Sequence, residues 1–235
     1  MSNISPIDGR YKKNVSELET FFSEQALMRH RVMVEVEYLL ALIEHKSFQK
    51  TRALSKKTLS SLKGLYVEFS ATHFKQIKKI EKKTNHDVNA VVVFVSEKLK
   101  KLGRGDLVPF VHFGLTSEDI NNISYSLMAQ GAVEDVMIPS VKRVLKELKA
   151  LSKKTKSLSL LSLTHGQPAT TTTLGKELAV FVSRVEREIA LIKKMKLLAK
   201  LSGATGSYAA HRVAFPDFNW PLFSKRFIKK LGLEQ

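Results

Sequence analysis

Three short polar segments of the sequence carry the side chains best suited to chemistry. They are TNHD at residues 84–87, TSED at residues 116–119 and THGQ at residues 164–167. Each combines hydroxyl, imidazole, amide or carboxylate groups at the expected N-terminus of a helix, where free backbone N–H groups and the helix dipole favour anions. Together they indicate a receptor for a small anionic molecule. Any one of them alone would be interpreted as a helix cap.

The elements that must position these segments are predicted to be helices. Ser16 and Glu19 have the spacing of a capping box, and the apolar stripe behind them continues to Leu42, which predicts a long first helix. A second, less regular helix is expected from Ser55 to about Ile80.

A valine-rich stretch follows the first polar segment. Its apolar residues between Val88 and Leu102 keep the i, i+3, i+4, i+7 spacing of a helix, so a helix is favoured over a strand. Asn85 or Asp87 is available as its N-cap, and Gly103 stands where the helix should end.

A long helix is expected behind the second polar segment. Thr116 and Ser117 can cap it, and it should run, bent near Pro139, to about Lys156. Helices of this length exceed the average of roughly 11 to 12 residues. They imply an elongated bundle whose remaining apolar faces find partners in a homo-oligomer.

The third polar segment lies in an expected loop at residues 158–169. A further helix is predicted for residues 171–201, with Gly203 and Gly206 ending it. The aromatic side chains of residues 215–235 predict one short helix near the end of the sequence.

The composition agrees with an all-α fold class. Of the 235 residues, 43% are hydrophobic, which suffices for a buried core, and only eleven are Gly and six Pro, which argues against a turn-rich β fold. The absence of Cys excludes a disulfide framework and a thiolate zinc site. No signal-like start and no apolar run of about 18 residues is present, so we expect a cytoplasmic protein without a membrane partner.

The net charge of +17 implies attraction to something anionic. The lysines alternate with apolar residues at helical spacing, which is typical of solvated helix faces, although steering of an anionic substrate also fits. No RNP-type aromatic motif, zinc-finger spacing or arginine-rich arm accompanies them, so we expect no specific nucleic-acid partner. A non-catalytic, basic helical binding or scaffold module remains the alternative to an enzyme.

The polar segments also carry a family resemblance. TNHD, TSEDINN and THGQPAT, with SPIDGRY at residues 5–11 and GATGSYAAH at residues 203–211, resemble blocks of the adenylosuccinate lyases, in the fumarase/aspartase superfamily. The similarity extends over essentially the whole chain. It implies an N-terminal helical domain at residues 1–110 and the first part of a central long-helix bundle at residues 111–235. HGQPA alone is shared with argininosuccinate lyase, which remains a rival within the superfamily.

The resemblance implies an elimination that releases fumarate from adenylosuccinate or from the succinyl-aminoimidazole-carboxamide ribotide of purine synthesis. Such a reaction needs a base to remove a proton beside a carboxylate, an acid to protonate the leaving nitrogen, and an anion clamp. His165 matches the family's general acid, a role that suits imidazole because its unperturbed pKa is about 6.5. The alternative for His165 is a loop histidine bonded to a backbone carbonyl.

The same resemblance implies a set of substrate-binding residues. Their guanidinium, hydroxyl, amide and imidazole groups would hold the phosphate and carboxylates of a succinylated purine nucleotide or its precursor. A helix cap or a turn is the alternative role for each. The set comprises Arg10, Tyr11, Asn85, His86, Asp87, Thr116 and Ser117. No metal and no cofactor is expected.

One part of the family pattern is missing from the sequence. The base of this superfamily is a serine on a glycine-rich loop of the SSxMPxKxNP kind, and the 235 residues contain no such stretch. We therefore expect the chain to be an N-terminal portion of the enzyme, inactive by itself. Family members form tetramers whose active sites combine three subunits, and whether this chain assembles in that way stays open.

Overall fold

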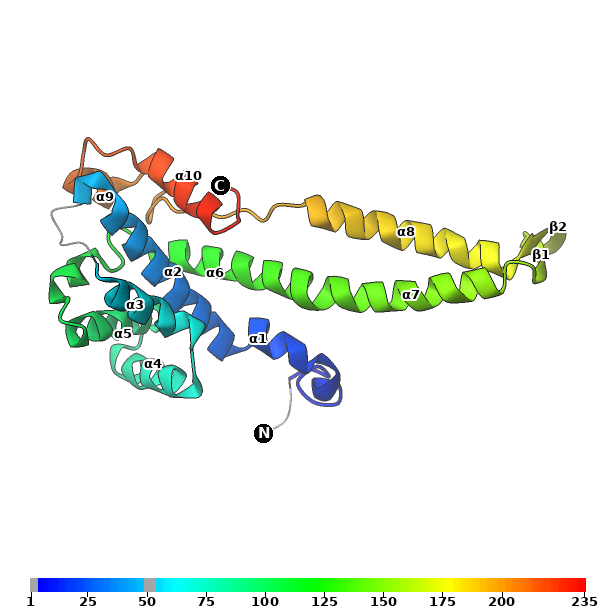
Figure 1. Cartoon of the computed structure of the whole chain (residues 1–235), viewed down its shortest axis with the longest axis horizontal. Coiled ribbons are helices and arrows are strands. Elements are labelled where there is room, and N and C mark those ends of the chain that lie inside the picture. The colour runs from blue at the N-terminus through cyan, green and yellow to red at the C-terminus, as the bar shows by residue number, and fades with distance from the viewer. Residues whose placement is uncertain (1–3, 49–53) are drawn as a thin grey trace. The chain divides into compact units, whose positions relative to one another are not determined.

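The computed structural model describes residues 4–48 and 54–235, and the regular elements of this part of the chain are helices apart from one β-hairpin (Figure 1). The all-α fold class is confirmed. The chain forms two compact units, Met1–Gln130 with Leu197–Gln235, and Gly131–Lys196. None of the helices in the described ranges is long and apolar enough to cross a membrane.

The first long helix begins later than the sequence pattern predicts. The chain starts with the 3-10 helix η1 (Lys12–Leu18) and the single turn α1 (Glu19–Phe22), and the long helix is α2 (Glu24–Glu44). Ser23 is its N-cap, because its backbone is extended and its hydroxyl accepts the Ala26 N–H at 3.1 Å.

The predicted capping box at Ser16 and Glu19 is therefore wrong. The Ser16 hydroxyl donates to the carbonyl of Lys13 at 3.3 Å, which closes a local turn instead of capping a helix.

The irregular second helix is two helices. They are α3 (Lys56–Val67), with Ser55 as N-cap, and α4 (Ala71–Thr84), with Ser70 as N-cap. Ser70 and His73 form a reciprocal capping box, which starts α4 as a new helix and explains the break in the apolar pattern.

The valine-rich stretch is the helix α5 (Asp87–Lys101), as predicted. Its N-cap is His86, whose ring accepts the Asn89 N–H at 3.2 Å, so the expectation of Asn85 or Asp87 in this role is wrong. Asn85 instead ends α4 in the left-handed conformation, at a φ of 50°. Gly103, at a φ of 70°, follows the end of α5 as expected.

The helix behind the second polar segment has three consecutive parts, two α-helical and one π-helical. It consists of α6 (Ser117–Gly131), the π-helical η4 (Ala132–Met137) and α7 (Ile138–Lys154). The predicted bend near Pro139 stays a prediction. The π-helical segment ends two residues before Pro139, which has no N–H to continue an α-helical ladder.

The expected loop at residues 158–169 is a β-hairpin. Its strands are β1 (Ser159–Thr164) and β2 (Gln167–Thr173), paired antiparallel with Thr164 opposite Gln167. The two turn residues between them both have positive φ, 50° at His165 and 75° at Gly166. A two-residue turn with this geometry matches the twist of paired strands, which is why the segment is a hairpin and not an irregular loop.

The next helix is shorter than predicted. It is α8 (Leu174–Lys194), capped by the hydroxyl of Thr173, whereas the apolar pattern continues to Leu201. After Lys194 the backbone hydrogen bonds are no longer helical, since the Ala199 N–H donates to the carbonyl of Glu234 at 2.7 Å. The chain is therefore extended where the pattern predicts helix.

The core of the larger unit lies between α2 and its neighbours. One cluster joins α2 to α3, α4 and α5 through residues such as Val36, Leu62 and Phe94. A second joins α2 and α6 to the short helix α10 (Trp220–Lys230) and includes Tyr208 and Phe215, which flank the short helix α9 (Ala209–Ala214). Helix α10 confirms the predicted aromatic helix near the end of the sequence.

The smaller unit is the hairpin together with α7 and α8, which pack against each other (Figure 1). Leu145 and Val182 are buried, and Gly175 approaches the backbone of Ser152 and Lys156 more closely than a Cβ atom would allow. The Ser152 hydroxyl donates to the carbonyl of Gly175 at 2.7 Å.

Candidate functional site

The TNHD segment is the junction between α4 and α5, and helix capping fixes its conformation. Because Nδ1 of His86 accepts the Asn89 N–H, a neutral imidazole carries its proton on Nε2. The ring is exposed, so this Nε2–H is available to donate to a ligand. His86 can therefore cap α5 through Nδ1 and donate to a ligand through Nε2.

Asp87 is held by a buried arginine. Nη2 of Arg31 lies 2.7 Å from Oδ2 of Asp87, and the Arg31 side chain is 3% exposed. Burial raises the pKa of Asp87, but the hydrogen bond from the Val88 N–H and the positive charge of Arg31 outweigh it, so the pKa lies below its ordinary value. Asp87 does not hydrogen-bond to His86, since Oδ1 and Nδ1 are 3.7 Å apart.

Arg31 also connects the TNHD segment to the helix of the TSEDINN segment. Its Nε donates to Oδ1 of Asn121 in α6 at 3.0 Å. One side chain from α2 thus holds the first and second polar segments together within the larger unit. The role of Arg31 was not predicted from the sequence. The one indication of it was a charged residue within the apolar stripe of α2.

The TSED turn is fixed by Asp119, whose side chain is fully buried. Its carboxylate accepts the backbone N–H groups of Thr116, Ser202 and Gly203 at 3.0 to 3.1 Å and pairs with Nζ of Lys200 at 2.9 Å. The glycine-rich segment behind α8 is thereby tied to the start of α6. Thr116 and Ser117 stay half-buried.

A hydrogen-bonded pair of His112 and Glu35 lies just before this turn. Nδ1 of His112 is 2.6 Å from Oε1 of Glu35, and Glu35 is fully buried in α2. Burial alone would lower the pKa of His112, but the hydrogen bond to Glu35 and its charge raise the pKa above the ordinary value. The sequence gives no sign that His112 and Glu35 are partners.

His165 occupies the tip of the hairpin in the smaller unit. Its backbone is left-handed, and its side chain is exposed. Among the described residues no group hydrogen-bonds to its imidazole. Its role as an acid stays a prediction.

Arg10 and Tyr11 end a compact turn at the start of the chain. The Tyr11 N–H donates to the carbonyl of Pro6 at 2.9 Å, and the Ser5 hydroxyl donates to Asp8 at 3.1 Å. The guanidinium of Arg10 lies 5.5 Å from the centre of the Tyr11 ring. Both side chains are exposed, which leaves the guanidinium fork open to a phosphate or carboxylate.

A pocket of about 620 Å³ opens over the TNHD segment. Its lining residues come from the last two turns of α4 and from the junction itself. They are Lys78, Glu81, Lys82, Asn85, His86 and Asp87.

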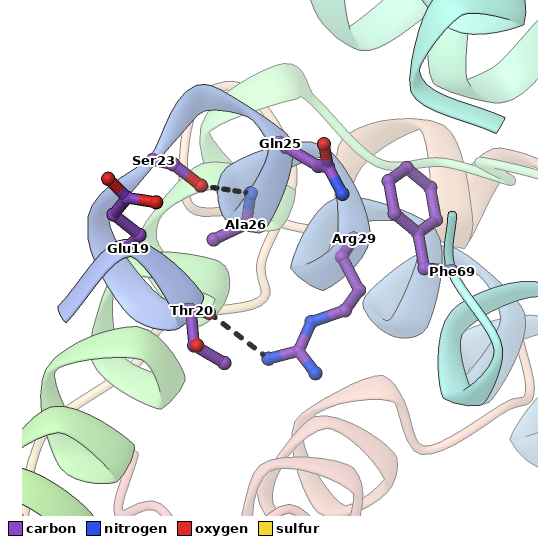
Figure 2. A pocket seen from close by; sticks show the side chains of 7 residues that line it. All are labelled: Glu19, Thr20, Ser23, Gln25, Ala26, Arg29 and Phe69. Atoms are coloured by element: carbon purple, nitrogen blue, oxygen red, sulfur yellow. Dashed lines mark hydrogen bonds between the residues drawn. The ribbon is translucent and has the colours of Figure 1, made fainter. Parts of the chain in front are cut away.

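A different pocket, of about 310 Å³, lies at the start of α2 and contains none of the predicted site residues (Figure 2). The guanidinium of Arg29 donates to the carbonyl of Thr20 at 3.5 Å, and burial lowers the pKa of Arg29. Glu19 and the Phe69 ring complete its walls.

In residues 4–48 and 54–235, no group of three or more His, Asp or Glu side chains is arranged to hold a metal ion.

Comparison with known proteins agrees with this arrangement of helices and polar junctions. Residues 9–234 match the model of a family described as lyase. The chain therefore belongs to this lyase family.

Curated relatives narrow the resemblance to one kind of lyase. The chain is 42% identical to the adenylosuccinate lyase of Buchnera aphidicola subsp. Schizaphis graminum and 42% identical to that of Dictyostelium discoideum, with 99% and 98% of the chain covered. Identity to the adenylosuccinate lyase of Escherichia coli strain K12 is 39% over the whole chain. The chain spans about half the length of these relatives, 51% to 52%.

Solved structures support the fold. A fumarate lyase from Mesorhizobium sp. BNC1 has a TM-score of 0.71 at 18% identity, covering 93% of this chain and 48% of the other. A β-carboxy-cis,cis-muconate cycloisomerase from Acinetobacter calcoaceticus has a TM-score of 0.67 at 20% identity, covering 94% and 49%. At such identities the likeness concerns the fold alone.

Proposed function

We propose that this chain carries the general acid and part of the substrate-binding site of an adenylosuccinate lyase. The reaction would be the β-elimination of fumarate from adenylosuccinate and from the succinyl-aminoimidazole-carboxamide ribotide. The observation that carries the proposal is the 39% to 42% identity to adenylosuccinate lyases along essentially the entire chain, including all three polar segments.

In this proposal His165 is the acid. A base removes the proton from the carbon beside a succinyl carboxylate, the C–N bond breaks, and its electron pair leaves with the nitrogen. The electrons of the broken C–H bond form the double bond of fumarate, and the imidazolium of His165 gives its proton to the departing nitrogen. An exposed imidazole without a competing partner in the described chain suits this role. The base would come from a segment outside these 235 residues.

The anion clamp would come from the larger unit. The amide of Asn85 and Nε2–H of His86 line the pocket over the TNHD segment and can donate to a carboxylate or phosphate. The hydroxyls of Thr116 and Ser117, on the turn that Asp119 fixes, would hold a succinyl carboxylate. Asp87, neutralised by Arg31, would keep the segment in place.

Arg10 and Tyr11 would complete the clamp. The guanidinium of Arg10 would bind the nucleotide phosphate as a bidentate fork. Both residues stand in an exposed turn, which supports their contact with a ligand.

The proposed enzyme acts as a homo-oligomer. Support comes from apolar side chains that α7 and α8 expose to solvent, including Val144 at 60%, Phe181 at 55% and Leu191 at 51%. Burying such a surface against copies of the same unit would be favourable. The cysteine-free sequence suits a cytoplasmic enzyme.

A fusion protein tests the proposal. The chain would replace the matching half of the Escherichia coli relative, and fumarate release would be followed with adenylosuccinate and, separately, with argininosuccinate. Fumarate from adenylosuccinate alone supports the proposal. Release from argininosuccinate would assign the chain to the rival lyase, and a folded fusion that is inactive on both would contradict a lyase role.

A further inference from the structure

Within residues 4–48 and 54–235, one of the two lysines that line the pocket over the TNHD segment has no ion-pair partner. Lys78 and Lys82 are four residues apart and therefore lie on the same face of α4, and Asn85, the C-cap of α4, also lines the pocket. This face continues the lining formed by His86.

The two acidic groups of the pocket already have partners. Oε2 of Glu81 lies 2.7 Å from Nζ of Lys78, which also contacts Glu24 outside the pocket at 2.6 Å. Oδ2 of Asp87 lies 2.7 Å from the guanidinium of Arg31 behind the pocket wall. Glu81 and Asp87 are therefore paired with cations other than Lys82.

Lys82 itself is exposed and has no ion-pair partner among the described residues. The groups left to meet a ligand are thus an ammonium from Lys82, an amide from Asn85 and an N–H from His86. All three can donate hydrogen bonds, and one is positively charged, so the pocket favours an anion.

We propose that Lys82 is a further substrate-binding residue, whose ammonium group binds a carboxylate or phosphate of the ligand held by Asn85 and His86. This inference rests on the proposed function and deepens it, since it adds a residue outside the TNHD motif. The sequence offers a matched control, because Lys83 is also an exposed lysine of α4 but does not line the pocket.

The test is a binding titration followed by NMR on the complete, isotope-labelled chain at constant ionic strength. Fumarate serves as the dicarboxylate probe and AMP as the phosphate probe, with the His86 and Asn85 signals as reporters. Lys82→Gln should lower the binding affinity for one of the two probes about tenfold, the effect expected for a charged hydrogen bond. Lys82→Arg should stay close to the unmodified chain, and Lys83→Gln should have no effect.

The probe that loses affinity identifies the anion that Lys82 binds. Equal weakening by Lys83→Gln would show general charge attraction and overturn the proposal, as would unchanged affinity in Lys82→Gln. If His86→Ala abolishes binding while Lys82→Gln does not, the TNHD site stands and only Lys82 is excluded. If neither probe gives saturable chemical-shift changes, both the TNHD binding site and the role of Lys82 are contradicted. This outcome is independent of whether the fusion protein releases fumarate.

Discussion

Nη2 of Arg31 lies 2.7 Å from Oδ2 of Asp87, so a buried residue of α2 holds the segment proposed to bind substrate. The same guanidinium donates to Asn121 in α6 at 3.0 Å. Asp87 and Asn121, which are 34 residues apart in the sequence, thus share one partner side chain. Helix caps and the contacts of Arg31 thus fix the backbone of the segments proposed to bind the ligand.

Replacing Arg31 should loosen this arrangement. Arg31→Met removes the partner of Asp87 and of Asn121, so we expect the free energy of unfolding to fall by about 2 to 3 kcal/mol. Urea unfolding monitored by circular dichroism measures the change. Arg187→Met is the matched control, since Arg187 pairs with Glu188 on an exposed surface and should change stability little. Equal losses in the two variants would argue against the structural role of Arg31.

Gly114 should not tolerate a side chain. Its φ is 69°, and an added Cβ would lie 2.6 Å from Cδ2 of the buried His211 ring. Gly114→Ala should therefore destabilise the chain by about 2 kcal/mol or more, because both the backbone and the packing oppose it. Thermal unfolding against Gly105→Ala provides the comparison, since nothing lies within 4 Å of a Cβ at Gly105. A Gly114→Ala variant as stable as Gly105→Ala would contradict this packing.

The pair of His112 and Glu35 should make stability depend on pH. The folded-state pKa of His112 is raised, so its contribution is fully present below the ordinary value of 6.5 and is lost as pH rises through the folded-state pKa. Compared with His112→Gln, the unmodified chain should gain about 1 to 2 kcal/mol at acid pH. This advantage should shrink at alkaline pH. Urea unfolding across the pH range tests it, and a difference that grows with pH would have the wrong sign.

The 235-residue chain alone should not release fumarate from adenylosuccinate. Its sequence contains the proposed acid and part of the proposed anion clamp but no serine-bearing signature loop, and loss of a general base costs typically 100- to 10,000-fold. A fumarase-coupled absorbance assay with a complete relative as positive control measures this. Turnover by the isolated chain that disappears in His165→Ala would mean that another residue of the chain supplies the base.

Much of the larger unit follows from the sequence. The apolar spacing of residues 88–102 identified α5, and Gly103 marked its end, because both features are local. The polar junctions were also visible in the sequence. Their partners were not, since Arg31 and Asp119 act across residues distant in the chain.

The predictions that the structure contradicts were wrong for physical reasons. Ser16 has the right spacing for a cap, yet Ser23 is the residue whose extended backbone lets its hydroxyl reach a helical N–H. The segment around His165 was predicted to be a loop because neither strand has a buried face to give an alternating pattern. Only the pair of left-handed residues at the turn defines the hairpin, and backbone angles are not visible in a sequence.

The central claim is that His165 acts as the general acid. The direct measurement is the rate of fumarate release by the fusion protein with His165→Ala, beside Leu163→Ala, an exposed residue of the same hairpin. We predict a fall in kcat of about 100-fold or more for His165→Ala, with KM nearly unchanged, and activity within a few-fold for Leu163→Ala. A folded His165→Ala fusion that keeps most of its kcat would contradict the account.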